Sequence, residues 1–167
     1  MPSILFVCTA NQFRSPLAAA KFSRMLSTKE LEREWTVSSA GTWAEGGLPL
    51  HPKAIQAAAK LGLTLKEHTT REVNKDMLNK ADLIVVMERG HREALESEFP
   101  ECKERICLLS EVAGGSATDI DDPARTNFAE ADAIAQRILD EVQKACVSLM
   151  DLARRNQAAR SVVKPQN

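Results

Sequence analysis

The sequence has almost no excess charge, few cysteines and no long apolar run. Its 167 residues carry a formal net charge of -1, which argues against nucleic acid or a membrane surface as the main partner. No apolar run approaches the ~20 residues needed to cross a bilayer. Residues Met1-Pro2-Ser3 lack the basic region and the apolar stretch of a signal peptide. We therefore expect a cytoplasmic protein, either a monomer or a weak dimer.

The four cysteines do not predict a disulfide framework or a zinc site. They are Cys8, Cys102, Cys107 and Cys146, and none of their spacings matches a structural zinc motif. Free thiols in this number are typical of a reducing compartment. We expect neither a metal ion nor a cofactor.

No internal repeat or low-complexity stretch is present, and the length and 44% apolar content suit one domain. Apolar runs alternate with helical patterns, which predicts a single α/β domain with a short central parallel sheet of about four strands and helices on both faces. The expected strands are 3–7, 35–39, 82–87 and 105–109, and the expected helices are 16–27, 52–61, 74–80, 89–97 and 127–153. The domain is predicted to cover residues 1–155, with a disordered tail at 156–167.

One short loop concentrates the chemistry of this sequence. Cys8 and Arg14 bracket residues 9–13, directly after the apolar run 4–7 and directly before Ser15-Pro16. A strand-loop-helix junction leaves backbone N–H groups free, and the helix dipole adds partial positive charge there. Such a junction binds anions, and a phosphate group suits it in particular.

The residue types in this loop indicate phosphoryl transfer to sulfur. The positive field favours the thiolate form of Cys8, which is the nucleophilic form. The guanidinium of Arg14 can hold two phosphate oxygens at once, whereas a lysine could not. Ser15 is placed to hydrogen-bond the sulfur. The sequence therefore predicts a cysteine-dependent phosphatase.

A proton donor for the leaving oxygen is also needed, and it is expected far along the chain. The candidate is the acidic cluster at residues 119–122, which Pro123 follows. Proline biases the preceding residue away from helical geometry, so that Asp122 can be presented on a rigid turn. A carboxyl group there can serve as general acid and later as general base.

At this point the chain resembles the low-molecular-weight protein tyrosine phosphatase family, from about Ile4 to about Leu152. The matching segments come in the order of the family. They are VCTANQFRSP at 7–16, VSSAGT at 37–42, HPKA at 51–54, Gly62 with HTTR at 68–71, ADLIVVM at 81–87, and Asp122-Pro123. The resemblance implies a flavodoxin-like strand order and metal-free hydrolysis of a phosphomonoester through a phosphocysteine intermediate.

The resemblance also implies a role for each matching residue. Cys8 is the implied nucleophile, Arg14 the transition-state clamp, and Asp122 the general acid and base. The residues implied to bind phosphate or substrate are Thr9, Ala10, Asn11, Gln12, Phe13, Ser15 and Trp43. Ser39 and His68 are implied to support Asn11. The implied partner is a phosphorylated protein, with phosphotyrosine as the first candidate, or a small phosphomonoester.

The chain departs from the family pattern at three places. Phe13 stands where the family often has a second loop cysteine, and Gln12 is a polar residue at the pocket mouth. Ala124-Arg125 follows Pro123, where the family usually has an aromatic residue that stacks on phosphotyrosine. The physiological substrate therefore stays open among phosphotyrosine, phosphoarginine and a small phosphorylated metabolite.

Two other functions compete with the phosphatase hypothesis. A thiol-dependent arsenate reductase shares this scaffold, and it would need further cysteines to relay electrons to a thiol donor. Cys102 and Cys107 are the candidates, although they do not lie beside Met87, where such reductases place their first relay cysteine. A non-catalytic phosphate-binding adaptor is the third hypothesis, but such proteins typically lose the nucleophile or the acid.

Overall fold

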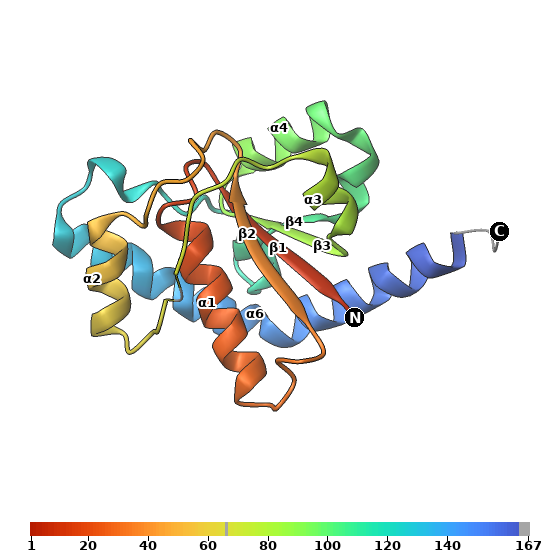
Figure 1. The fold of residues 1–167 in the computed structure, drawn as a ribbon, viewed down its shortest axis with the longest axis horizontal. Helices are drawn as coiled ribbons and strands as arrows, with labels where there is room; N and C mark the ends of the chain where they lie inside the picture. Colours follow the sequence, from red (N-terminus) through yellow and green to blue (C-terminus); the bar gives the residue numbers. More distant parts are fainter. Residues whose placement is uncertain (66, 164–167) are drawn as a thin grey trace.

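The computed structural model describes residues 1–65 and 67–163. Within these residues, four parallel strands form one sheet in the order β2-β1-β3-β4 (Figure 1). The strands are β1 (Ser3–Cys8), β2 (Thr36–Gly41), β3 (Leu83–Val86) and β4 (Ile106–Leu108). This arrangement confirms the predicted α/β class, the number of strands and the flavodoxin-like order. The strand bounds differ from the predicted ones by one or two residues.

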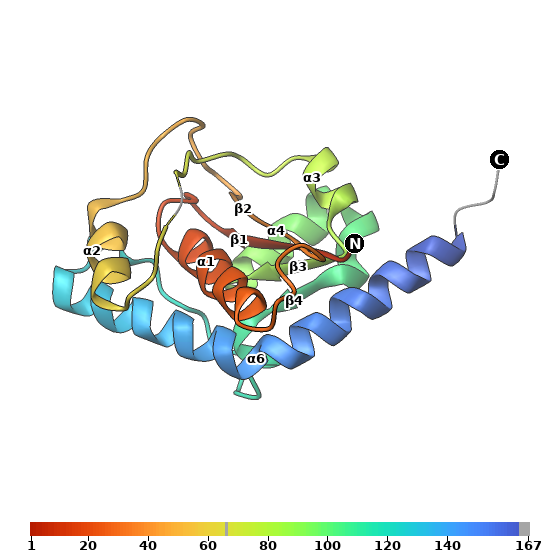
Figure 2. The same ribbon diagram turned by 60° about the horizontal axis from the view of Figure 1, so that its bottom comes forward.

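Helices cover both faces of the sheet (Figures 1 and 2). The elements α1, α2, α5 and α6 contribute to one core, whereas α3, α4 and η1 contribute to the other. Their bounds are α1 Arg14–Ser27, α2 Pro52–Lys60, α3 Lys75–Lys80, α4 Arg89–Glu98, α5 Leu109–Val112 and α6 Phe128–Val163, with the 3₁₀ turns η1 Pro100–Arg105 and η2 Pro123–Arg125.

The central strand β1 shows why its sequence is apolar throughout. Successive side chains of a strand point to opposite faces, so that Ile4 and Phe6 enter the core beneath α1 and α6, while Leu5 and Val7 enter the core beneath α3 and α4. Both faces are covered by helices, and neither offers a place for a polar residue. Phe6 also packs against Phe22 of α1 with ring centroids 5.8 Å apart.

The last helix is longer than predicted. The sequence predicts its end at residue 153 and a disordered tail from residue 156, but α6 continues to Val163. The expectation of disorder is therefore wrong for residues 156–163, whereas residues 164–167 lie outside the described part of the chain. No helix in the described residues, α6 included, is both long enough and apolar enough to span a membrane.

Polar contacts, rather than an apolar face, hold this extension against the sheet. Asn156 Nδ2 donates to Asp82 O at 2.9 Å, and Arg160 Nη1 donates to Ala81 O at 3.0 Å. Arg160 also forms an ion pair of 2.5 Å with the buried carboxylate of Asp82. Such contacts leave no hydrophobic periodicity, which is the signal from which helix ends are predicted.

Candidate active site

The loop between β1 and α1 is closed around the side chain of Asn11. Asn11 has a φ of 57°, in the left-handed region that asparagine adopts more readily than most residues. Its Nδ2 donates to Ser15 Oγ at 2.9 Å and to Ser39 Oγ at 3.0 Å. Its Oδ1 accepts from the backbone N–H of Arg71 at 3.1 Å. The side chain is fully buried, and these bonds hold the loop in its curved conformation.

His68 contacts the same residue through the backbone. Its Nε2 lies 2.8 Å from the carbonyl oxygen of Asn11. Both residues that the resemblance assigned to the support of Asn11, Ser39 and His68, thus lie within hydrogen-bonding distance of it. They come from β2 and from the segment before α3, so the loop is braced by parts of the chain distant in sequence.

The end of β2 runs along this loop at very close range. Thr42 N donates to Cys8 O at 2.8 Å, and Trp43 N donates to Thr9 O at 3.0 Å. A Cβ atom on Gly41 would lie 2.3 Å from Thr9 O and 3.0 Å from the backbone nitrogen of Asn11. Only glycine fits at this position without displacing the loop.

The thiol of Cys8 and the hydroxyl of Ser15 are in contact. Cys8 Sγ lies 3.0 Å from Ser15 Oγ, and Ser15 Oγ also lies 3.2 Å from Ala40 O. A serine hydroxyl has one proton to donate, and a thiolate is a stronger acceptor than a neutral carbonyl. Ser15 is therefore positioned to donate to the sulfur whenever Cys8 is ionised.

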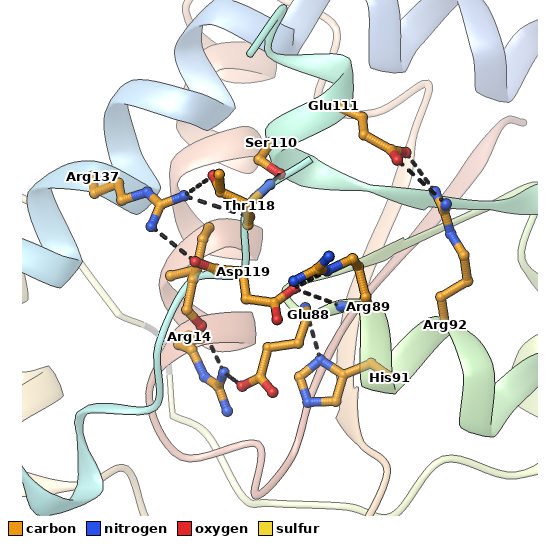
Figure 3. A network of polar contacts seen from close by, with 11 residues as sticks. Arg14, Glu88, Arg89, His91, Arg92, Ser110, Glu111, Thr118, Asp119 and Arg137 are labelled. Atoms are coloured by element: carbon orange, nitrogen blue, oxygen red, sulfur yellow. Dashed lines mark hydrogen bonds and ion pairs between the residues drawn. The ribbon is translucent and has the colours of Figure 1, made fainter. Parts of the chain in front are cut away.

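The guanidinium of Arg14 is almost fully buried and lies among four oxygen-bearing groups. Its Nη1 donates to Ile120 O at 2.8 Å and to the carboxylate of Glu88 (Figure 3). Its Nη2 donates to Thr9 Oγ1 at 3.1 Å and lies 3.5 Å from Asp122 Oδ2. Arg14 thus connects the β1–α1 loop, the start of α4 and the acidic loop.

Sequence reasoning missed Glu88 and His91. Glu88 precedes α4 and His91 lies in its first turn, so both lie near the carboxyl end of β3. Ligands bind at such strand ends in open α/β sheets, and this rule could have pointed to them. Glu88 N donates to His91 Nδ1 at 3.1 Å (Figure 3), so the neutral ring carries its proton on Nε2. This Nε2 lies 2.9 Å from Thr9 Oγ1.

Burial is the main reason why the pKa of His91 is lowered, and the positive charge of Arg14 adds to the effect. The pKa falls from 6.5 to about 4. His91 therefore stays neutral at ordinary pH and acts as a fixed hydrogen-bonding neighbour of the loop.

The β1–α1 loop, His51 and the acidic loop surround a small pocket, and Cys8 and Arg14 are part of its lining. Its volume is about 50 Å³, a few times the ~10–15 Å³ that a single water needs. Its lining residues are Cys8, Ala10, Gln12, Phe13, Arg14, His51, Asp122, Pro123 and Ala124. The structure thus brings Cys8, Arg14 and Asp122 to one cavity. These are the residues that the sequence predicts as nucleophile, clamp and acid.

Of the predicted binding residues, Ala10, Gln12 and Phe13 line this pocket, whereas the other four do not. Asn11 and Ser15 are buried behind the loop, and Thr9 contacts Arg14 and His91. Trp43 is not among the residues that line the pocket, and its side chain is 83% exposed. Its implied role in substrate binding stays a prediction.

Asp122 is held by its own turn and by Arg14. It is the N-cap of η2, and its Oδ1 accepts from Ala124 N at 3.0 Å. Its side chain is 46% exposed, so it meets both the pocket and solvent. Among the described residues, no cluster of three or more His, Cys, Asp or Glu side chains is arranged to hold a metal ion.

Comparison with known proteins shows similarity over almost the whole chain. Residues 3–160 match the family model described as low molecular weight phosphotyrosine protein phosphatase. A probable low molecular weight protein-tyrosine-phosphatase of Ralstonia solanacearum is 33% identical, covering 83% of this chain and 91% of that protein. An arsenate reductase of Halalkalibacterium halodurans is 32% identical, with coverages of 84% and 89%. The solved structure of the YwlE arginine phosphatase with a phosphorylated active-site serine has a TM-score of 0.83 at 25% identity, with coverages of 92% and 99%.

Proposed function

Since the chain belongs to the low molecular weight phosphotyrosine protein phosphatase family, we propose that it hydrolyses phosphomonoesters with Cys8 as the nucleophile. The observation that supports this most strongly is the common pocket of Cys8, Arg14 and Asp122. Arg14 contacts the acidic loop directly, at 3.5 Å from Asp122 Oδ2. A thiolate, a guanidinium and a carboxyl group at one small cavity are the groups that phosphoryl transfer to sulfur requires.

The first step forms an S–P bond and breaks the P–O bond to the leaving group. Cys8 Sγ attacks phosphorus in line, and the backbone N–H groups of residues 9–14 with the Arg14 guanidinium bind the three equatorial oxygens. Asp122 donates its proton to the leaving oxygen, which departs as a neutral alcohol or phenol. Asp122 is left as a carboxylate beside the phosphocysteine.

The second step reverses these roles. The Asp122 carboxylate takes a proton from a water molecule, the water oxygen bonds to phosphorus, and the S–P bond breaks. The electron pair returns to Cys8 as a thiolate, and the Ser15 hydroxyl, 3.0 Å from the sulfur, stabilises it. Inorganic phosphate leaves, and the enzyme returns with Asp122 protonated.

We propose a phosphorylated protein as the substrate, with phosphotyrosine as the first candidate. The family description and the Ralstonia relative support this choice. The arginine phosphatase that resembles this fold keeps phosphoarginine as an alternative, and a small phosphomonoester is the third. This choice of substrate is tested with one peptide sequence that carries phosphotyrosine, phosphoarginine or phosphoserine at the same position. The ratio of the kcat/KM values compares how well the enzyme binds the transition state of each phosphorylated side chain.

Thiol-dependent arsenate reduction is the second candidate, favoured by the similarity to an arsenate reductase. The positions of the other cysteines argue against it. Cys102 packs on the opposite face of the sheet from Cys8, and burial raises the pKa of its thiol. Burial also raises the pKa of Cys107 to about 12. Such thiols are poor nucleophiles for an electron relay.

The deciding experiment is hydrolysis of p-nitrophenyl phosphate with a chelator present, with Cys8→Ser as control. We expect chelator-resistant turnover that Cys8→Ser lacks, together with a phosphorylated Cys8 trapped by acid quenching. Full turnover by Cys8→Ser would refute the proposal. Thioredoxin-coupled reduction of arsenate that is lost in Cys102→Ser or Cys107→Ser would establish the reductase instead.

We further propose that the protein works in the cytoplasm as a monomer or a weak dimer. The cytoplasmic part of the proposal rests on its cysteines, which are thiols at all four positions, as is usual in a reducing compartment. Light scattering across a concentration series measures the oligomeric state.

A further inference from the structure

The segment His51–Ala54 matches the family pattern, yet the proposed mechanism does not use it. Its local roles account for three of the four residues. His51 caps α2, its Nδ1 accepting from Lys53 N at 3.1 Å, Pro52 occupies the first turn, and Ala54 is buried in the core. Lys53 has no such role in the helix.

The side chain of Lys53 instead reaches across to the acidic loop. Its Nζ donates to Pro123 O at 3.2 Å and also to Thr126 O. The same Nζ lies 6.0 Å from the ring centroid of Phe128, the first residue of α6. One ammonium group thus binds both ends of the short turn that begins immediately after Asp122.

The opposite end of the acidic loop is fastened separately. Arg89 N donates to Asp119 Oδ1 at 2.8 Å (Figure 3), and Ile120 N donates to Met87 O at 2.9 Å. Ile120 O accepts from Arg14. Between these contacts and those of Lys53 lie Asp121 and Asp122, both of which are exposed.

The position of the Asp122 carboxyl group therefore depends on both attachments. Within its own turn the side chain accepts a single bond, from Ala124 N. General acid catalysis requires the carboxyl group within hydrogen-bonding reach of the leaving oxygen, and small displacements reduce the rate. Loss of the contacts to Pro123 and Thr126 would release the turn that carries Asp122.

We propose that Lys53 is a positioning residue for Asp122, acting through the carbonyl groups of Pro123 and Thr126. The inference rests on the proposed function, because it assigns Lys53 a purpose only if Asp122 is the acid. Lys53 does not touch the phosphoryl group in this arrangement. Its removal should impair proton transfer and leave the phosphate-binding loop intact.

The test compares two substrates that differ in their need for a proton. Phenyl phosphate has a poor leaving group, and p-nitrophenyl phosphate a better one. For Lys53→Met we expect kcat/KM for phenyl phosphate to fall roughly 10-fold to 100-fold, with a clearly smaller fall for p-nitrophenyl phosphate. Inhibition by inorganic phosphate should stay unchanged, and Lys53→Arg should retain most of the activity because it can still donate to both carbonyls.

Lys60→Met is the matched control, because Lys60 lies on the same helix but pairs with Asp132, away from the pocket. A second arm places Lys53→Met in the Asp122→Asn background, where no further loss is expected. Additive losses, or equal losses for both substrates, would overturn the inference while the phosphatase function stands. If Asp122→Asn itself left both substrates unaffected, the acid assignment would fail first, and the role of Lys53 with it.

Discussion

Arg14 Nη2 lies 3.5 Å from Asp122 Oδ2, which joins the start of α1 to the acidic loop before α6. The buried cation and the half-exposed carboxyl group share one pocket. An anion that enters this pocket therefore meets the guanidinium of Arg14 and the carboxyl group of Asp122 together.

Replacement of Asp122 by Asn should lower turnover by about 10²–10⁴-fold, the usual contribution of general acid catalysis. The loss should be smaller for substrates whose leaving group needs no proton. Steady-state kinetics on two aryl phosphates measure both effects. Asp121→Asn is the control, since Asp121 is an exposed neighbour outside the pocket lining. An unchanged rate for Asp122→Asn would move the acid role to Asp121 or Asp119.

Replacement of Arg14 by Lys should cost about 10²–10³-fold in kcat, the usual effect of removing one preorganised donor. The charge is kept, but a lysine cannot grip two phosphate oxygens in the plane of a guanidinium. Arg24→Lys serves as control, because Arg24 lies on the same helix and donates only to Gly62 O at the surface. Near-normal kcat in Arg14→Lys would mean that the bidentate grip is unnecessary.

Replacement of Gly41 by Ala should damage both stability and activity. The added Cβ would meet the backbone oxygen of Thr9 at 2.3 Å, and backbone atoms cannot move aside without shifting the loop. We expect a destabilisation of about 1–3 kcal/mol, typical of overpacking, in urea unfolding. Gly90→Ala is the matched control, because a Cβ there meets nothing within 4 Å. Equal stability in both variants would contradict the close approach of β2.

The lowered pKa of His91 predicts a pH-dependent loss of stability. Unfolded His91 binds its proton near pH 6.5, while the folded ring stays neutral down to about pH 4. The unfolded state therefore binds more protons in this window, so the contribution of His91 is complete above pH 6.5 and is lost as pH falls towards 4. The shift corresponds to at most about 3 kcal/mol.

Urea unfolding at pH 7, 5.5 and 4 measures this effect as the difference between the native protein and His91→Gln. The variant should lose less stability on acidification, since glutamine does not titrate. Parallel pH dependences in the two proteins would show that His91 is protonated in the folded state as readily as in the unfolded one.

Much of the fold followed from patterns that are local in the chain. The apolar run at residues 4–7 predicted β1. A helix was predicted from residue 127, and α6 begins at Phe128 with Asn127 Oδ1 accepting from Glu130 N at 2.8 Å. The end of α6 was not predictable in this way. Arg160 and Asp82 meet only after folding, and a contact between distant polar residues leaves no periodic signal.

Local sequence identifies the residues that can do the chemistry, because Cys8, Arg14 and Ser15 lie on one strand-loop-helix junction whose geometry follows from neighbouring residues. The acidic cluster before Pro123 predicted Asp122 as the acid, and the resemblance assigned it the same role, although nothing local brings it near Cys8. That Glu88 and Ile120 bind Arg14, and that Lys53 binds the turn after Asp122, follows from the folded arrangement alone. These partners come from segments that follow different strands of the sheet, and the order of the parallel strands, not sequence distance, sets which segments meet at its carboxyl edge.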